Sequence, residues 1–310
     1  MTGQDTRELA AIIRRLSRPL DPQPTGVEPR LPKLDGIKVV VFDVYGTLII
    51  SGSGDISLTS GASHGDAAID AWKSITSGEP GASATGGVQG CPPVADAHGS
   101  PSSGDALVAA LRQAIQEEHA ASPHEFPEVE IRDIWRSLDG SLSDTQIARL
   151  AVEYECRVNP VWPMPGCGET LAALRDVGLP LGIVSNAQFF TPIAMEELLG
   201  DSLAGLGFEQ SLCVWSYAHR QAKPGTFLYE QSAAALAERS IAPQQVLYVG
   251  NDMRNDVWPA SRVGFRTALF AGDARSLRLR EDDQQVAGVE PDAVLTDLRQ
   301  ILTVLPLADG

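Results

Sequence analysis

Cysteine is scarce in this chain of 310 residues, and neither cysteine nor histidine forms a recognisable motif. No pair has Cys-x-x-Cys or metal-ligand spacing among the four cysteines, which are Cys91, Cys156, Cys167 and Cys213. No His-Glu-x-x-His pattern occurs among the five histidines, which are His64, His98, His119, His124 and His219. We therefore expect free thiols in a reducing, cytoplasmic compartment, and neither a disulfide framework nor a zinc motif.

Long hydrophobic runs are also lacking. No stretch approaches the roughly 18 apolar residues that would predict a membrane-spanning helix. Residues 1–30 lack the apolar segment of a signal peptide. Their apolar residues recur instead at the spacing of one helix face, and these are Leu9, Ile12, Ile13 and Leu16. The sequence thus predicts a soluble protein without a membrane partner.

Basic residues are few relative to acidic ones. The chain has 24 Lys and Arg against 40 Asp and Glu, which gives a net charge of −16. Binding to nucleic acid requires clustered Lys and Arg, so a nucleic-acid partner is not expected. A small anionic substrate remains compatible with this composition, because a metal ion or a lysine can dominate the field inside a pocket.

Composition divides the first third of the chain. Residues 1–34 combine the short helix with a proline-rich connector, since five prolines lie between positions 18 and 34. Gly, Ser, Ala and Pro dominate residues 51–103, where we expect a mobile insertion with one weakly helical patch at Ile69–Ile75. The histidines of this insertion and Cys91 are expected on its surface.

Helical patterning resumes in residues 104–159. Asp105 is a candidate N-cap for a first helix, and Ser143 or Asp144 for a third. Three helical faces are expected from the apolar residues Leu107, Leu111 and Ile115; Val129, Ile131, Ile134, Trp135 and Leu138; and Ile147, Leu150, Ala151 and Tyr154. The block either forms a smaller helical domain over one end of the core or simply covers a sheet.

Strands and helices alternate in residues 35–50 and 160–310. Apolar runs predict strands at Ile37–Phe42, Leu181–Val184, Leu212–Trp215, Val246–Val249, Thr267–Phe270 and Ala293–Leu295. Helices are expected between them at Glu169–Val177, Ala194–Leu199 and Phe227–Glu238. This alternation predicts an α/β fold with a doubly wound parallel sheet. Ligands in such sheets bind at the carboxyl ends of the strands.

Polar side chains follow four of these strands. Asp43 comes directly after the first strand and before a tight turn at Gly46. Ser185 and Asn186 follow the second strand, and Lys223 follows the third. A lone serine here is usually a helix N-cap and a lone lysine a surface charge. Because the carboxyl ends of parallel strands meet at one edge of the sheet, we expect the residues that follow these strands to line one pocket.

The fourth strand is followed by an acidic cluster. Asp252 and Asp256 are four residues apart, so they can lie on one helical face. Mg²⁺ in proteins prefers one or two carboxylates together with water and substrate oxygen atoms. We therefore expect both carboxylates to converge on one Mg²⁺, with Asn251 as a further candidate ligand. Capping of the following helix is the alternative role for either aspartate.

The stretch VVVFDVYGTLI, which contains Asp43, resembles the first motif of the haloacid dehalogenase superfamily of hydrolases. The order of aspartate, serine, lysine and acidic pair resembles the same family across residues 37–300. The resemblance implies a Rossmann-like core and a helical cap inserted after the first motif. It implies catalytic roles for Asp43, Lys223 and Ser185, and substrate contacts from Tyr45, Thr47, Ser185, Asn186 and Lys223. It implies metal ligation by Asp43, the backbone carbonyl of Tyr45, Asp252 and Asp256.

The residue at position 45, here Tyr45, differs between the phosphatases and the dehalogenases of that family. Most phosphatases of the family have a second aspartate at this position as general acid and base, whereas the first motif of L-2-haloacid dehalogenases reads much like FDVYGTL. The acidic cluster at Asp252 and Asp256 favours a Mg²⁺-dependent phosphatase of a small phosphorylated metabolite. A cofactor-independent dehalogenase and a relative that binds ligands without turnover are the alternatives. The sequence predicts no oligomeric state.

Overall fold

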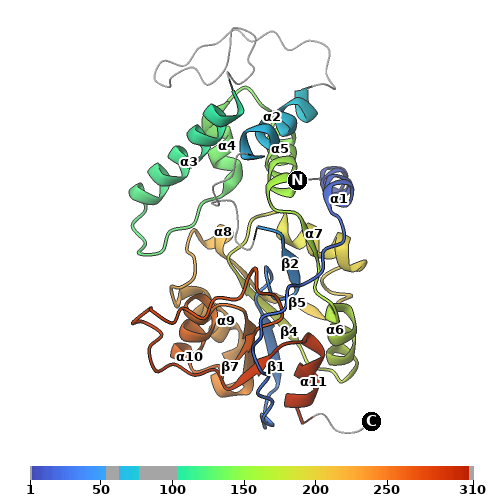
Figure 1. The fold of residues 1–310 in the computed structure, drawn as a ribbon, viewed down its shortest axis with the longest axis vertical. Helices are drawn as coiled ribbons and strands as arrows, with labels where there is room; N and C mark the ends of the chain where they lie inside the picture. The colour runs from blue at the N-terminus through green and yellow to red at the C-terminus, as the bar shows by residue number, and fades with distance from the viewer. Residues whose placement is uncertain (1, 54–62, 77–102, 307–310) are drawn as a thin grey trace.

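The computed structural model describes residues 2–53, 63–76 and 103–306, which form a sheet-containing core and a helical unit above it (Figure 1). A six-stranded sheet in the order β5-β4-β1-β6-β7-β8 lies at the centre of the core. Its strands are β1 (Val39–Phe42), β4 (Leu181–Ser185), β5 (Phe208–Trp215), β6 (Val246–Gly250), β7 (Arg266–Phe270) and β8 (Ala293–Leu295). Every neighbouring pair is parallel, which confirms the predicted α/β fold.

Both faces of the sheet are covered because successive side chains of a strand point to opposite sides. Val40 and Phe42 of β1 join the apolar cluster that contains residues of α6 and α11, whereas Val39 and Val41 join the cluster of α9 and α10. These helices are α6 (Cys167–Asp176), α9 (Phe227–Ala237), α10 (Trp258–Val263) and α11 (Ile301–Val304). The continuous apolar run of β1 therefore follows from burial on both faces.

The helical unit is inserted between β1 and β4. It contains α2 (Ser63–Thr76), α3 (Gly104–Ala121), α4 (Ile131–Leu138) and α5 (Asp144–Val158). The strands β2 (Ile49–Ser51) and β3 (Val161–Pro163) connect the unit to the core and pair with each other in antiparallel fashion. The side chain of Ser103, not Asp105, caps α3, while Ser143 caps α5 through a reciprocal capping box.

The helix α2 differs from the expectation for residues 51–103. The sequence predicted a mobile insertion with a weak helical patch, but α2 has 14 residues and packs against α3 and α5. Ala71 and Trp72 are buried in the apolar cluster of the helical unit. His64 is also buried, with Nδ1 3.2 Å from the hydroxyl of Tyr154, so it is not the surface residue expected. His98 and Cys91 lie outside the described residues.

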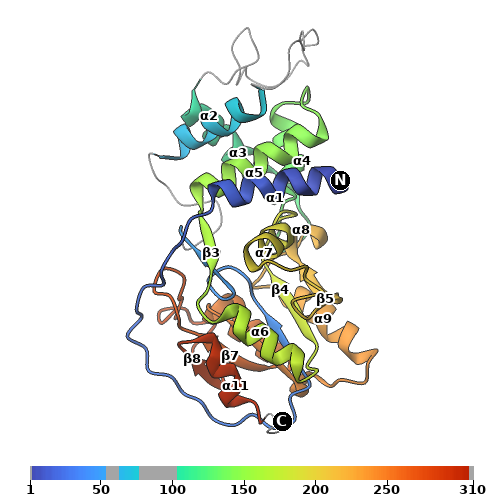
Figure 2. The same ribbon diagram turned by 90° about the vertical axis from the view of Figure 1, so that its right-hand side faces the viewer.

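The N-terminal helix α1 (Gly3–Leu16) packs on α5 of the helical unit and on α7 (Thr191–Leu199) of the core. The predicted apolar face is confirmed, because Leu9, Ile12 and Ile13 are buried. Arg14 pairs with Glu197 of α7 and Arg15 with Glu153 of α5. Figure 2 shows α1 lying along α5, with the proline-rich connector running down the side of the core. Thus α1 touches both parts of the molecule.

Short elements complete the chain, and none of the described helices is long and apolar enough to cross a membrane. The short elements are α8 (Ser216–His219), single turns at Pro243–Gln245 and Leu298–Gln300, and a wide turn at Met253–Val257. The cysteines in the described part of the chain, Cys156, Cys167 and Cys213, are free thiols, and burial raises their pKa values to about 12.

The packing of α1 predicts a measurable contribution to stability. Ile13 is fully buried, so Ile13→Ala removes buried methyl groups and leaves a cavity. We expect the free energy of unfolding to fall by about 2–5 kcal/mol. Urea denaturation followed by circular dichroism measures this, with Arg7→Ala at an exposed position of the same helix as the matched control. Equal stability of the two variants would contradict the packing.

Candidate active site

Lys223 binds two buried carboxylates at the carboxyl edge of the sheet. Its Nζ donates to Oδ1 of Asp43 at 2.7 Å and to Oδ1 of Asp256 at 2.6 Å. Burial alone would lower the pKa of Lys223, but the charges of Asp256 and Asp43 outweigh burial and raise it. Burial raises the pKa of Asp256 to about 6; Lys223 opposes this rise, while Asp43 adds to it. One ammonium group therefore joins two acids where water is largely excluded.

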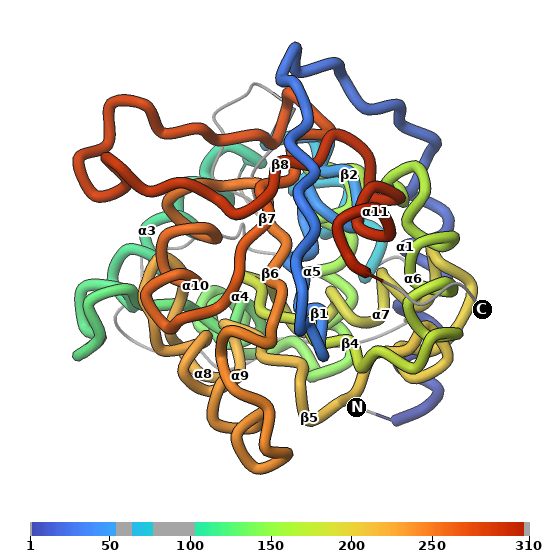
Figure 3. The backbone as a smooth tube through the Cα atoms, turned by 90° about the horizontal axis from the view of Figure 1, so that it is seen from below, coloured from blue at the N-terminus to red at the C-terminus, as the bar shows by residue number. Residues whose placement is uncertain are grey.

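The strand order explains why these residues meet. Asp43 follows β1, Lys223 lies on the chain after β5, and Asp256 follows β6. Figure 3 shows β1 near the middle of the sheet, with β4 and β5 on one side and β6, β7 and β8 on the other. From β1 the chain first adds β4 and β5 on one side of the sheet and then β6, β7 and β8 on the other side, so the strand order reverses at β1. Such a switch point leaves a crevice at the carboxyl ends of the strands.

Asp256 reaches Lys223 from a wide turn that follows β6. The N–H of Val257 donates to the carbonyl of Asp252, five residues back, and the next N–H likewise donates to that of Met253. Wide turns of this kind occur frequently at functional sites. A Cβ at position 250 would lie 2.4 Å from Cγ of Asp256, so only glycine at Gly250 permits this close approach.

Tyr248 supports the same cluster, although the sequence analysis missed it. Its hydroxyl oxygen lies 3.0 Å from Oδ1 of Asp256 and 2.9 Å from the carbonyl of Val184. Burial, followed by the charge of Asp256, raises the pKa of Tyr248 well above its ordinary value. A tyrosine inside a fully buried strand needs a hydrogen-bond partner for its hydroxyl, and this was the signal available in the sequence.

Asp252 has different partners from Asp256. Its Oδ1 accepts hydrogen bonds from the backbone N–H groups of Arg254 and Asn255. Arg280 donates to both carboxylate oxygens, with its NH2 nitrogen 2.6 Å from Oδ2. The carboxylate of Asp252 therefore caps the wide turn and pairs with an arginine. This is the capping alternative of the sequence analysis, whereas Asp256 alone of the two binds Lys223.

Asn251 is held from two sides. Thr47, which is fully buried, donates to Oδ1 of Asn251 at 3.2 Å, and Nδ2 of Asn251 donates to the carbonyl of Ser276 at 2.6 Å. A Cβ at position 46 would lie 2.4 Å from Cβ of Ser276, and Gly46 also has a φ of +80°. Glycine is therefore needed where the first turn meets the segment after β7.

Ser185 and Asn186 act on their surroundings in different ways. Ser185 is fully buried, and its hydroxyl donates to the carbonyl of Asn186 at 3.2 Å. The side chain of Asn186 accepts from the backbone N–H of Lys223 at 2.8 Å and donates to the Lys223 carbonyl at 3.3 Å. Both amide contacts fix the backbone that carries Lys223, so Asn186 positions the lysine.

Tyr45 points to a different partner from the aspartates. Its hydroxyl lies 2.9 Å from Oγ1 of Thr191 at the start of α7. Burial raises the pKa of Tyr45, and the charge of Glu155 raises it further. The side chain is therefore neutral and hydrogen-bonded near pH 7, and it is poorly suited to donate a proton to a leaving group.

These strand ends surround a cavity of about 80 Å³. It is lined by Asp43, Tyr45, Asn186, Lys223, Asn251, Asp252, Asn255, Asp256, Ser276 and Arg278. Ser276 and Arg278 were not predicted, because they follow a fifth strand, β7, and no motif in the sequence marks that segment. The hydroxyl of Ser276 is buried and has no hydrogen-bond partner among the described residues.

The lining of this cavity has the donor atoms that suit a hard cation. Within the described ranges, no group of three or more His, Cys, Asp or Glu side chains is arranged to hold a metal ion. Asp43, Asp252 and Asp256 nevertheless line the cavity together with Asn251. Mg²⁺ is commonly held by one or two carboxylates plus other oxygen atoms. A Mg²⁺ ion bound here would therefore need the side-chain amide of Asn251 or a backbone carbonyl as a ligand in addition to carboxylates.

Comparison with known proteins identifies the family of this chain. A family model described as haloacid dehalogenase-like hydrolase matches residues 37–264, over half of the chain. A glyceraldehyde 3-phosphate phosphatase from Pyrococcus furiosus is 25% identical over 216 residues, or 69% of this chain and 82% of the relative.

Two solved structures resemble the chain at low identity. The 2-haloacid dehalogenase from Pseudomonas syringae pv. Tomato DC3000 is 18% identical, with a TM-score of 0.52 over 86% of this chain and 97% of that chain. A HAD phosphatase from Thermococcus onnurineus is 16% identical, with a TM-score of 0.49 over 86% and 98%. The dehalogenase shares the fold, and the family match over residues 37–264 shows that the chain belongs to the haloacid dehalogenase-like hydrolases.

Proposed function

We propose that this hydrolase removes phosphate from a small phosphorylated compound, with Asp43 as the nucleophile and Mg²⁺ as the cofactor. The observation that carries the proposal is the position of Lys223 between Asp43 and Asp256. An ammonium group there offsets the negative charge of the nucleophile and of an incoming phosphate. The weak similarity to a glyceraldehyde 3-phosphate phosphatase supports phosphate as the group transferred.

The reaction follows from the placement of Asp43. One carboxylate oxygen attacks phosphorus, the bond from phosphorus to the ester oxygen breaks, and an aspartyl phosphate forms as the ester oxygen leaves with the bonding electron pair and takes a proton from water. A water molecule then attacks phosphorus, which releases inorganic phosphate and restores the carboxylate. Lys223 stays within hydrogen-bond distance of Asp43, and Asn186 holds the lysine backbone in place. Ser185 and Thr47 support the residues that line the cavity.

The proposed Mg²⁺ site consists of Asp43, the backbone carbonyl of Tyr45, Asn251 and Asp256. A bound Mg²⁺ would polarise the phosphate oxygens and offset their charge. Asp252 is not part of this set, because its carboxylate pairs with Arg280 and caps the wide turn. Asn251 takes its place in the proposal because Asn251 lines the cavity and its amide is held in one orientation.

Dehalogenation of a small 2-haloacid is the second candidate function, and Tyr45 favours it. A dehalogenase needs no proton donor for a halide leaving group, and the hydroxyl of Tyr45 is occupied by Thr191. Chloride release from L-2-chloropropionate that is unaffected by EDTA would support this candidate and contradict the phosphatase.

Replacing the nucleophile tests the proposal directly. Asp43→Asn keeps the size of the side chain but removes its nucleophilic charge, so we expect release of phosphate from p-nitrophenyl phosphate to fall on the order of 10⁴-fold or more. Activity of the unmodified protein should require Mg²⁺ and disappear with EDTA. Circular dichroism checks that the variant is folded. Unchanged turnover would remove Asp43 from the mechanism, and no turnover of either substrate class by the unmodified protein would favour a ligand-binding relative.

The two acidic residues after β6 are expected to respond differently. Asp256→Asn should raise the Mg²⁺ concentration for half-maximal activity about 10- to 100-fold, because it removes a proposed ligand and a partner of Lys223. Asp252→Asn should leave this concentration nearly unchanged and lower the free energy of unfolding by about 1–3 kcal/mol, because Arg280 loses its carboxylate. Magnesium titration of activity and urea denaturation measure both effects. The reverse order of magnesium effects would show that Asp252 is the ligand.

Tyr45→Phe tests the role of the tyrosine hydroxyl. Because the pKa of Tyr45 is raised above its ordinary value of about 10, the hydroxyl does not titrate between pH 5 and 9. We expect the shape of the pH–rate profile to be the same in the variant and the unmodified protein. The lost contact with Thr191 should cost about 1 kcal/mol of stability. Disappearance of one limb of the profile would instead identify Tyr45 as a proton donor.

A further inference from the structure

A second, larger cavity lies between the helical unit and the core. Its volume is about 230 Å³, and it is lined by residues of α3, α4, α5 and the loop that follows β4. Most of its lining is apolar and includes Leu111, Ile115, Val129, Ile131, Trp135 and Phe190. Leu111 and Trp135 are buried, so these two side chains are largely removed from water. Pockets of this apolar character are typical binding sites for small organic groups.

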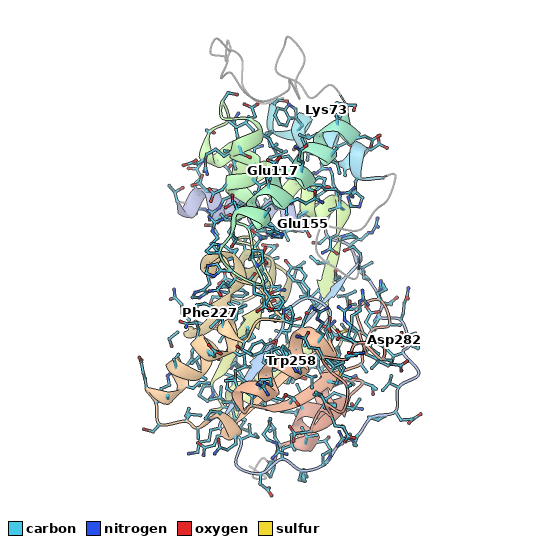
Figure 4. The ribbon with its side chains drawn as sticks, turned by 90° about the vertical axis from the view of Figure 1, so that its left-hand side faces the viewer. Lys73, Glu117, Glu155, Phe227, Trp258 and Asp282 are labelled. Carbon is cyan, nitrogen blue, oxygen red and sulfur yellow. The ribbon has the colours of Figure 1, made fainter. Side chains whose placement is uncertain are left out.

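The larger cavity adjoins the candidate active site. Asn186, which holds the backbone of Lys223, lines both cavities. Glu155 of α5 lines the larger cavity and is close enough to Tyr45 for its charge to raise the pKa of that tyrosine. Figure 4 shows Glu155 in the part of the helical unit nearest the core. A molecule with its phosphate beside Asp43 can therefore extend its organic part into the larger cavity.

The size of the cavity limits the group that it accepts. An apolar cavity of about 150 Å³ holds one benzene molecule, so about 230 Å³ has room for one to two fused rings.

The lack of a proton donor at Tyr45 also favours a ligand with an aromatic ring. Without a proton donor at this position, cleavage depends on an alcohol that leaves as a stable anion. A phenol, with a pKa of about 10, leaves far more readily than an alkyl alcohol. An aryl group thus satisfies both the shape of the cavity and the absence of a carboxylic acid at position 45.

We propose that the substrate is a phosphate ester of an aromatic alcohol with one or two rings. The ring lies in the cavity between α3, α4 and α5. This inference rests on the phosphatase function proposed above. Attack by Asp43 breaks the bond between phosphorus and the aryl oxygen, and the aryl oxide leaves with the bonding electron pair and takes a proton from water.

Three phosphates separate the effect of the ring from that of the leaving group. 2-Naphthyl phosphate has both features, acetyl phosphate has only a good leaving group, and cyclohexylmethyl phosphate has only an apolar ring. We expect kcat/KM with Mg²⁺ to be at least about tenfold higher for 2-naphthyl phosphate than for either of the others. Equal values for 2-naphthyl and acetyl phosphate would contradict a role of the cavity.

A cavity-filling variant supplies the matched test. Ala151→Leu places three more carbon atoms in the lining of the cavity, while Ala109→Leu makes the same change at an exposed position of α3. Ala151→Leu should lower kcat/KM for 2-naphthyl phosphate at least about tenfold, mainly through KM, and leave acetyl phosphate within twofold. Ile115→Phe repeats the test if the first variant does not fold. Equal losses on both substrates would overturn the proposal.

Binding to the Asp43→Asn variant tests the cavity independently of turnover. Calorimetry with 2-naphthol should show binding that Ala151→Leu weakens at least about tenfold. Binding of 2-naphthol without hydrolysis of any phosphate would refute the phosphatase and retain the aryl site. Hydrolysis of acetyl phosphate without binding of 2-naphthol would refute the aryl site alone.

Discussion

The contact of one lysine with two buried carboxylates determines the rest of the site. Lys223 lies between Asp43 and Asp256, and all three side chains are largely removed from water. Removing one partner from a buried ion pair typically costs about 3–5 kcal/mol, because the remaining charge is left without compensation. The surrounding structure holds this cluster in place. Gly250 leaves room for Asp256, Asn186 fixes the backbone of Lys223, and the hydroxyl of Tyr248 contacts the carboxylate of Asp256.

The sequence was sufficient for the fold and for the residues that bear charge. Apolar runs and glycine turns are local features, so the strands that end at Phe42, Ser185 and Gly250 could be placed from sequence alone. The same holds for the three helices of residues 104–159, whose apolar residues recur at helical spacing. The sequence was insufficient for predicting the packing of α2. The small residues around Trp72 are buried by contact with helices that are distant in the sequence. Composition reports the average polarity of a segment and not its packing partners.

The division of roles within the acidic cluster could not be predicted either. Asp252 and Asp256 are equivalent by type and spacing, but a wide turn rotates one toward Lys223 and leaves the other facing Arg280. Arg280 and Ser276 come from the segment after β7, which no motif marks. The chemistry at the site therefore depends on contacts between segments that are 20 or more residues apart, as in the pair of Asn251 and Ser276, separated by 25 positions.

The central claim is that Asp43 becomes covalently phosphorylated. Acid quenching during turnover of an aryl phosphate with Mg²⁺, followed by borohydride reduction and peptide mass spectrometry, tests it most directly. The account predicts conversion of Asp43 to homoserine only when substrate is present, with Asp252 and Asp256 unchanged. An unmodified Asp43 under conditions of continuing phosphate release would contradict the account.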